Sequence, residues 1–424
     1  MEFSDLAQAE WLRSQTSQRM LANKMKMGLL SIVTLLCFFA PAHQAHLLSA
    51  TISDLSFKNM DFAMNLYRKI SGYNDQNIFF SPLSISTSFA VLLMAADGVT
   101  HEEILKGLNL EQLERADQPE LIPRLFQLLH ENITQNGTLR LDQGMGMFVG
   151  QEFVLEEKFQ EQIKRYFDTD IKTVDFTDTK GSRSFINEYI KNKTEGKVTE
   201  VISSLDVRTQ LMLINTIFFQ GTWQKHFNPN LTMSAPFYID NYNIVQVPMM
   251  FLEDKFYMME DSALGAKVLK LPYREGVSML ILLPNKGMDY TVIDDGITAK
   301  KFFSWIRRLQ KTKLEVNLPK FKMEESYALH NLLPDMGMAS VFSNSANLTK
   351  LSEEESLKVS EVRHKAVIEV DESGTTAAAA TTTGIIPYSL PRTFIVNRPF
   401  FFFIYHEYTN CLLFMGRVID PTKN

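Results

Sequence analysis

The chain has 424 residues, of which 45% are hydrophobic and 22% charged, and its formal net charge is −6. This composition is ordinary for a globular protein, and without a long basic run it gives no reason to expect a nucleic-acid partner. The length would allow about two or three domains. No Pro-, Gly- or Ser-rich linker and no repeat divides the sequence, so we expect one large domain behind a processed N-terminus.

The N-terminal segment is typical of a secretory signal. Lys24 and Lys26 precede an apolar run over residues 28–40, and small residues follow at Ala42 and Ala45. Thirteen apolar residues are too few to span a bilayer. A buried helix is the alternative, but it accounts for neither the basic flank nor the small residues. The pattern predicts a secreted, extracellular protein.

We therefore expect an N-terminal extension and signal over residues 1–45 and a single domain over 46–424. Met25 and Met27 are both plausible alternative starts. Because Cys37 lies in the signal, Cys411 has no partner for an internal disulfide. It lies in an apolar strand, where an inert buried thiol is expected.

Five glycosylation acceptors follow the signal, each with threonine two residues after the asparagine. They are Asn132, Asn136, Asn192, Asn230 and Asn347. A single acceptor often arises by chance, whereas five behind a signal indicate a secreted glycoprotein.

Apolar residues at helical spacing predict helices in the first half of the chain. The predicted helices cover residues 55–70, 84–96, 102–108, 121–131 and 181–194. β-Branched and aromatic runs between turn residues then predict strands. These cover residues 211–219, 277–283, 313–318 and 400–405. Helices come first and no regular βαβ alternation appears, so we expect an α+β fold with largely antiparallel sheets.

No motif of an enzyme stands out. The sequence lacks G-x-S-x-G, H-E-x-x-H, C-x-x-C and P-loop patterns. Three glycines approach a dinucleotide fingerprint with a spacing one residue too long, namely Gly144, Gly146 and Gly150. Three His-Glu pairs lack the second histidine of a zinc site, beginning at His101, His130 and His406. These absences argue against an enzyme or a metal site, although a triad can assemble from residues far apart in sequence.

The most unusual segment is EVDESGTTAAAATTTGIIPYSLPR, residues 369–392. Residues 374–386 contain neither charge nor proline. A flexible linker is one interpretation, but linkers are usually Gly/Ser-rich or charged. A loop that must also become a strand fits better, because proline lacks the ladder N–H and a buried charge is costly. Pro387 would mark the end of such an insertion.

Six motifs in the same order resemble those of the serpins. They are NIFFSPLSIS from Asn77, LINTIFFQGTW from Leu213, VPMM from Val247, LPKFKME from Leu318, NRPFFFFIY from Asn397 and FMGRVIDP from Phe414. The resemblance covers nearly the whole mature chain. It implies the serpin fold: three β-sheets, eight to nine helices and an exposed reactive-centre loop at about 372–392.

The resemblance also implies a mechanism without a catalytic residue of the protein's own. A serine protease attacks the bait residue through its own serine and forms an acyl-enzyme. The freed loop inserts into the main sheet, and the distorted protease stays trapped. The protein would thus be an irreversible, suicide-substrate inhibitor.

The resemblance places the reactive bond at Tyr388–Ser389, because seventeen residues from Glu372 to Tyr388 match the family's loop length. The hinge that would insert first consists of small or matching residues: Glu372, Gly374, Thr375, Ala377, Ala378, Ala379 and Ala380. Thr376 replaces a common glutamate at a position expected to face solvent. Non-inhibitory carrier serpins often have proline or charge in this hinge, so the pattern favours inhibition.

Further positions resemble the parts beneath the main sheet. Those matching the shutter, a polar cluster under the strands that must part, are Ser81, Ser84, Asn187 and His364. Those matching the breach, near the point of first insertion, are Asn215 and Trp223. A satisfied buried polar group would be the default interpretation of any one of them.

Tyr388 alone predicts a chymotrypsin-like target, independent of any partner. A closer resemblance lies in the Tyr-Ser bond and in KRYFDT from Lys164, VLKLPY from Val268 and VIEVDESGT from Val367. It points to the branch of serpins that inhibit coagulation factor Xa with protein Z as cofactor, and factor XIa unaided. A partner that holds inhibitor and protease together offsets a poor primary residue. No other cofactor is implied, and a monomer is expected.

The same resemblance implies surface sites. The protein Z surface would comprise Asp75, Asp240, Tyr242 and Asp295, although Gly72 and Asn241 depart from the pattern. Solvated surface carboxylates are the alternative interpretation. Glu315 matches an acidic exosite for factor Xa, whereas Gly384 replaces an acidic loop residue.

The surface expected to bind heparin lacks most of its expected basic residues. Lys106 is basic as expected, but three other expected basic positions hold Leu105, Gln118 and Gln127. We therefore expect only weak stimulation by heparin.

Overall fold

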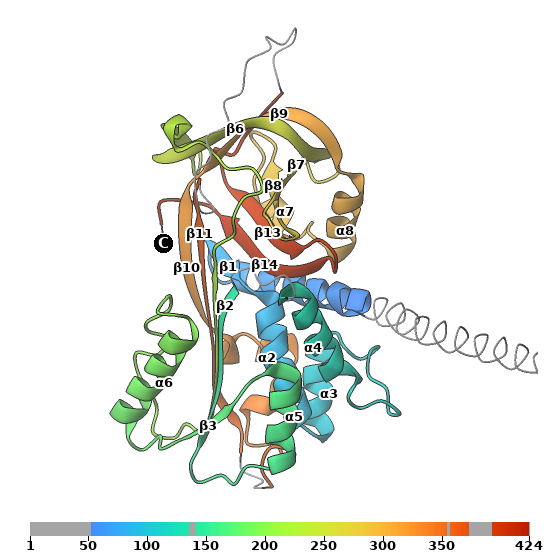
Figure 1. Ribbon diagram of the computed structural model, residues 1–424, viewed down its shortest axis with the longest axis vertical. Coiled ribbons are helices and arrows are strands. Elements are labelled where there is room, and N and C mark those ends of the chain that lie inside the picture. The colour runs from blue at the N-terminus through green and yellow to red at the C-terminus, as the bar shows by residue number, and fades with distance from the viewer. Residues whose placement is uncertain (1–51, 135–140, 354–356, 373–391, 424) are drawn as a thin grey trace, which may run out of the picture. The chain divides into compact units, whose positions relative to one another are not determined.

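The structure is a computed structural model that describes residues 52–134, 141–353, 357–372 and 392–423 (Figure 1). Ser53–Asn424 form one compact unit, separate from Met1–Ile52. Within the described ranges, no helix combines the length and apolarity that crossing a membrane requires. The predicted signal, Asn136 and most of the hinge and reactive bond lie outside these ranges.

Eight α-helices occur in the described residues. The first includes residues 53–71, and the others are α2 (Pro82–Ala95), α3 (Gly98–Gly107), α4 (Leu121–Thr134), α5 (Glu157–Phe167), α6 (Thr179–Lys193), α7 (Thr291–Asp294) and α8 (Ala299–Arg308). Short 3-10 helices are η1 (Pro229–Leu231), η2 (Leu329–Asn331), η3 (Pro334–Met336) and η4 (Ser340–Phe342). All five predicted helices are present, and α5, α7 and α8 were not predicted.

A five-stranded sheet runs through the lower part of the molecule in Figure 1. Its order is β10 (Phe321–Ala328), β11 (Val359–Val370), β4 (Leu211–Phe219), β2 (Leu141–Gly150) and β3 (Ile171–Val174). β11 pairs antiparallel with β10 but parallel with β4. β4 pairs antiparallel with β2. The parallel pair therefore lies inside the sheet.

The second sheet has nine strands. Its order is β1 (Ile78–Phe80), β14 (Cys411–Val418), β13 (Phe400–His406), β8 (Val277–Pro284), β7 (Ala266–Pro272), β6 (Ile244–Asp261), β9 (Gln310–Pro319) and β12 (Arg392–Ile395), with β5 (Met233–Tyr238) on β6. The long strand β6 changes partner along its length, from β5 and β9 to β7. Two of the three sheets that the resemblance implies are thus one hydrogen-bonded sheet joined at β6.

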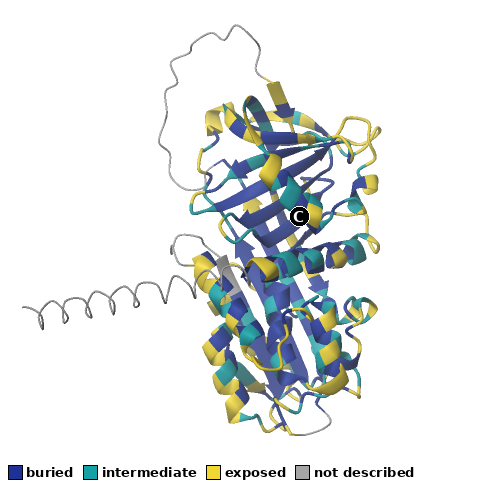
Figure 2. Cartoon of the chain, turned by 90° about the vertical axis from the view of Figure 1, so that its right-hand side faces the viewer, coloured by how far each residue is buried: buried dark blue, intermediate teal, exposed yellow. Residues whose placement is uncertain are grey.

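The core lies between the sheets and the helices that cover them. Helices α2, α4 and α5 lie on one side of the five-stranded sheet and α6 lies on the other (Figure 1). β4, β13 and β14 are buried at every residue, and dark blue strands fill the interior in Figure 2. Each fully buried Phe of β13 contributes about 2–3 kcal/mol through the apolar surface it removes from water.

Candidate functional site

The parallel pair of β4 and β11 is the structural centre of the candidate site. Its register runs from Leu211 opposite Val359 to Phe219 opposite Ile368. β11 ends at Val370, just before the segment 373–391 that lies outside the described residues. Antiparallel ladders are slightly more stable per residue than parallel ones. A strand running opposite to both neighbours would therefore replace one parallel ladder with two antiparallel ones.

A buried polar cluster joins this pair to the start of α2. The Nδ1 atom of His364 on β11 lies 3.0 Å from Oδ1 of Asn215 on β4. The hydroxyl of Ser84 donates to the same Asn215 oxygen at 2.7 Å. The Nδ2 of Asn215 donates to Ser88 Oγ at 2.7 Å and to the Ser84 carbonyl at 2.8 Å. The cluster thus links both strands of the parallel pair to one helix.

His364 is held in a single neutral tautomer. The backbone N–H of Ser81 donates to His364 Nε2 at 3.1 Å, so this nitrogen carries no proton and Nδ1–H donates to Asn215. The His364 side chain is fully buried, and burial lowers its pKa from 6.5 to about 3. Protonation would place an N–H against the Ser81 N–H in an apolar surrounding.

The structure changes the predicted membership of the shutter. Ser81, Ser84 and His364 lie together, and Asn215, which was expected at the breach, belongs to the same cluster. Asn187 does not. Its Oδ1 accepts from the N–H of Val201 and Ile202 at 2.9 and 3.2 Å, and its Nδ2 donates to the Ile202 carbonyl. Asn187 lies on α6, on the other side of the sheet, and orders the chain that follows that helix.

Trp223 fixes the end of β11. Its Nε1–H donates to the carbonyl oxygen of Asp371 at 2.9 Å, and its ring stacks on Tyr273 with centroids 4.1 Å apart. The aromatic stack is buried, and the hydrogen bond satisfies the indole N–H that burial would otherwise leave unpaired. Trp223, which was predicted at the breach, therefore contacts Asp371, the residue before Glu372 of the predicted hinge.

Glu372 is the one predicted hinge residue within the described ranges. Its carboxylate accepts from Lys320 Nζ at 2.6 Å and from Thr232 Oγ1 at 2.7 Å. Its side chain is nearly buried. Burial acts to raise the pKa of Glu372, but the hydrogen bonds from Lys320 and Thr232 outweigh it and the pKa is lowered. Sequence reasoning did not identify Lys320 and Thr232, although Lys320 lies within the LPKFKME motif.

The remaining residues of the predicted hinge and bait lie outside the described residues. They are Gly374, Thr375, Ala377, Ala378, Ala379, Ala380, Tyr388 and Ser389. Their assignments stay predictions.

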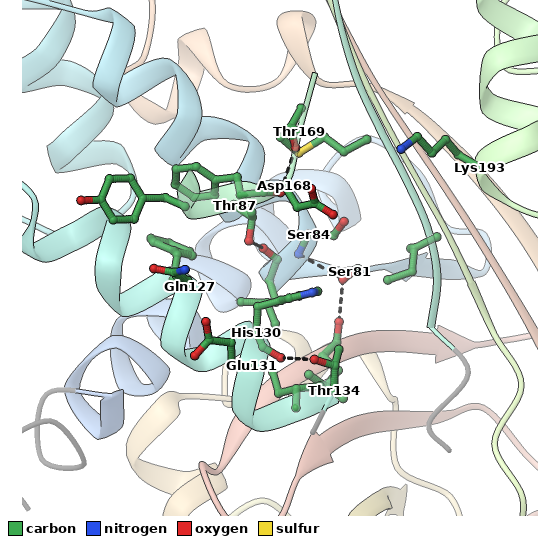
Figure 3. Close-up of a pocket in the computed structure, with 18 of the residues that line it drawn as sticks. Ser81, Ser84, Thr87, Gln127, His130, Glu131, Thr134, Asp168, Thr169 and Lys193 are labelled. Atoms are coloured by element: carbon green, nitrogen blue, oxygen red, sulfur yellow. Dashed lines mark hydrogen bonds between the residues drawn. The ribbon is translucent and has the colours of Figure 1, made fainter. Parts of the chain in front are cut away.

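A cavity of about 420 Å³ lies beside the polar cluster (Figure 3). Ser81 and Ser84 line it on one side, and Gln127, His130 and Thr134 of α4 line it on another. Burial lowers the pKa of His130.

The described residues contain no group of three His, Cys, Asp or Glu side chains that could hold a metal ion. Burial raises the pKa of the Cys411 thiol to about 12.

The predicted protein Z residues lie on exposed loops. Asp75 and Tyr242 line one cavity of about 730 Å³, and 94% of Tyr242 is exposed. The Oδ1 of Asp240 accepts from the N–H of Tyr242 and of Asn243 at 2.7 and 2.8 Å, and its Oδ2 accepts from Asn243 Nδ2. These bonds lower the pKa of Asp240, with the Asn243 side chain the largest cause. Asp240 therefore holds the turn that presents Tyr242, and Asp295 is exposed at the end of α7.

The predicted exosite and heparin positions differ in exposure. Glu315 on β9 is half-buried, between Glu253 of β6 and Thr393 of β12. Leu105 is buried in the core. Gln127 donates to the Arg165 carbonyl at 3.2 Å. Lys106 and Gln118 are exposed.

Among the described glycosylation acceptors, exposure varies. The exposed asparagines are Asn132, Asn192 and Asn230. Asn347 is half-buried, and its Oδ1 accepts from the Thr349 hydroxyl at 2.8 Å.

Known proteins resemble this chain over most of its length. The family model described as Serpin (serine protease inhibitor) matches residues 57–421. The protein Z-dependent protease inhibitor of Mus musculus is 38% identical over 369 residues, which are 87% of this chain and 82% of that protein. The crystal structure of mouse protein Z-dependent protease inhibitor has a TM-score of 0.82 at 37% identity, covering 88% of this chain and 99% of that one. Human thyroxine-binding globulin, crystallised with thyroxine, has a TM-score of 0.81 at 31% identity, with 88% and 100% covered.

Proposed function

Because the chain belongs to the serpin family of protease inhibitors, we propose that it is a secreted, irreversible inhibitor of serine proteases that acts by loop insertion. The observation that carries this proposal is the parallel pair of β4 and β11. The chain leaves β11 at Val370 and, after Asp371, Glu372 and Ser373, enters a charge-free, proline-free tract, residues 374–386. A chain that turns back between the two strands runs antiparallel to both, which is the more stable pairing.

The lengths of the tract and the strands agree. Residues 374–386 would extend over about 43 Å as a strand, and the twelve residues of β11 extend over about 40 Å. The tract can therefore fill the whole space between β4 and β11. Cleavage at Tyr388–Ser389 would release it while the protease serine remains esterified to Tyr388. Insertion then carries the protease to the far end of the sheet.

The polar cluster sets the resistance to this opening. Parting β4 from β11 separates Asn215 from His364, whose hydrogen bond bridges the two strands. Ser84 holds Asn215 from the side of α2. A buried bond of this kind contributes about 0.5–1.5 kcal/mol when made and costs about 1–3 kcal/mol when one partner is left unpaired. The cluster therefore resists the separation of β4 from β11, and contacts made by the inserted strand would have to offset the cost of breaking its hydrogen bonds.

For the target, we propose coagulation factor Xa with protein Z as cofactor, and factor XIa. The names of the similar mouse protein and of its crystal structure support protein Z as a partner. The exposed Tyr242, held by the Asp240 turn above the cavity that Asp75 also lines, supports a docking surface there. An inhibitor of chymotrypsin-like proteases is the alternative that Tyr388 alone favours.

The experiment compares complex formation with factor Xa and with chymotrypsin on an SDS gel, with and without protein Z, calcium and phospholipid. We expect a covalent complex with factor Xa whose rate of formation rises with protein Z. Tyr242→Ala should lose most of this acceleration and keep the rate measured without protein Z. Tyr408→Ala, which removes another exposed tyrosine (81% exposed), is the matched control.

Three other outcomes of this experiment would change the proposal. Equal rates with and without protein Z would remove the cofactor from the proposal and leave the inhibitor. Complex formation with chymotrypsin alone would select the chymotrypsin-like alternative. Cleavage without any complex would contradict inhibition and favour a carrier role. The likeness to thyroxine-binding globulin supports a carrier as the alternative.

A further inference from the structure

A small aromatic cavity lies between β6, β7, β9 and the chain that contains Trp223. Its volume is about 100 Å³. The aromatic walls are Trp223, Phe227, Phe256 and Tyr257. Trp223 and Phe227 lie edge to face with ring centroids 6.0 Å apart. A cavity of this size and lining takes a single aromatic ring and not a polymer chain.

Lysines surround Tyr257 on the same face of the sheet. Tyr257 on β6 lies directly opposite Lys270 of β7 and Lys311 of β9. Lys255, two residues before Tyr257, lies opposite Lys313. Direct cross-strand partners share a face, as do residues two apart on one strand. All four ammonium groups are therefore carried on one face.

The positive charge at the cavity exceeds the negative charge. Its lining includes four lysines: Lys225, Lys255, Lys270 and Lys311. Lys225 pairs with Asp254, and Lys270 pairs with Glu407 at 2.9 Å. Lys255 and Lys311 form no ion pair with any residue that the structure describes. Two lysines without a direct ion pair thus remain beside an aromatic pocket in a chain of net charge −6, and Lys311 interacts with the Asp254 carboxylate only beyond ion-pair distance.

The facing lysines also repel one another, and a bound anion would remove this repulsion. Like charges directly opposite one another on a sheet destabilise the pairing, and Lys255 lies opposite Lys313. Glu253 pairs with Lys313 at 2.6 Å, so of the two facing lysines only Lys255 makes no ion pair with a described residue. The ammonium of Lys311 lies 5.8 Å from the Tyr257 ring centroid. An anionic group at the mouth of the cavity would meet both free ammonium groups.

We propose that this cavity binds an aryl phosphate or aryl sulfate ester, with the ring against Trp223 and the anionic group between Lys255 and Lys311. The chemistry is shared by a free aryl ester and by a tyrosine side chain esterified on its hydroxyl. Trp223 also holds the carbonyl of Asp371 through its indole N–H. The ligand would therefore lie beside the start of the hinge.

The test uses the full-length protein, with phenyl phosphate and phenyl sulfate as probes in isothermal titration and in tryptophan fluorescence. Trp223 is the only one of the described tryptophans that lines the cavity. We expect saturable binding of at least one ester, with an emission change that follows the same binding curve. Phenol and inorganic phosphate should each bind at least about tenfold more weakly, because each lacks one of the two contacts. N-Acetyl-O-sulfotyrosine amide binding as tightly would identify a modified side chain as the source, and weaker binding a free ester.

Variants locate the site. Lys255→Ala and Lys311→Ala should each weaken binding at least about fivefold, since each removes a hydrogen bond to a charged group. Both lysines are exposed, so folding should be retained. Lys158→Ala on α5 removes the same charge away from the cavity and should leave the affinity unchanged. No saturable binding of either ester, or binding that both cavity variants retain, would overturn the proposal.

Discussion

At the scale of single residues, His364 shows how a buried polar group can be satisfied and still depend on pH. Its two ring nitrogens have fixed and opposite roles, since one donates to Asn215 and the other accepts from the Ser81 N–H. A histidine with a lowered pKa stays neutral in the folded chain while the unfolded chain takes up a proton. The free energy of unfolding therefore falls as the pH falls from 6.5 to about 3.

Replacing His364 tests this directly. His364→Ala leaves the Ser81 N–H unpaired and opens space in the core, so we expect a loss of about 2–4 kcal/mol in the free energy of unfolding at pH 7. Between pH 6 and 4 the variant should also lose about 1.4 kcal/mol per pH unit of the dependence seen in the parent protein. Urea unfolding across this range measures both effects. Parallel curves for parent and variant would show that His364 does not control the dependence.

The ion pair of Glu372 and Lys320 is the second residue-scale feature. Lys320→Met leaves a nearly buried carboxylate without its cation, and we expect a loss of about 1–3 kcal/mol. Because the pKa of Glu372 is lowered, this contribution is present above pH 4.5 and is lost as the pH falls through the lowered value. Lys322→Met, two residues further along the chain on β10 but exposed and unpaired among the described residues, is the control and should change little. Equal urea midpoints for both variants would contradict the role of the pair.

Among the helices and strands, those whose residues follow a simple periodic pattern were predicted from the sequence. The predicted strand 211–219 has the same bounds as β4, whose residues other than Asn215 and Thr216 are apolar on both faces because both are buried. β11 was not predicted, because Glu361, Arg363 and Lys365 interrupt its apolar pattern although it pairs on both sides. The 18-residue β6 was not predicted either, because a change of partner along a strand leaves no periodic signal.

In the candidate site, too, the sequence identified single residues but not all of their contacts. Motifs identified Ser81, Ser84 and His364, but sequence order could not tell which asparagine meets them. That contact depends on how β4 and α2 pack, across 131 residues of chain between Ser84 and Asn215. The resemblance to serpins supplied a reason to look for such a cluster, and the three-dimensional arrangement decided its members.

A substitution in the hinge tests whether the tract enters between the two strands. Thr375→Arg places a charge where the tract would enter between β4 and β11, and burying an unpaired charge costs several kcal/mol. We expect the variant to be cleaved as a substrate, with at least about tenfold less covalent complex on a gel. Thr376→Glu, at a position expected to face solvent, should leave the complex yield unchanged. Full complex yield from Thr375→Arg would contradict insertion at this point.

For the molecule as a whole, inhibition by insertion requires two alternative arrangements of one sheet. In the structure β4 and β11 are paired, Asn215 and His364 bridge them, and Trp223 and Lys320 hold the end of β11 through Asp371 and Glu372. The tract after Glu372 is the only additional strand that this account needs. We therefore claim that the pair opens and accepts residues 374–386.

The thermal unfolding temperature after a single cut at Tyr388–Ser389 tests whether the pair opens, and it requires no knowledge of the target protease. We predict that the cut protein unfolds at least about 10 °C higher than the intact protein, since insertion replaces one parallel ladder with two antiparallel ones. Cut Thr375→Arg should show little of this increase. An unchanged unfolding temperature in the cut parent protein would contradict the claim.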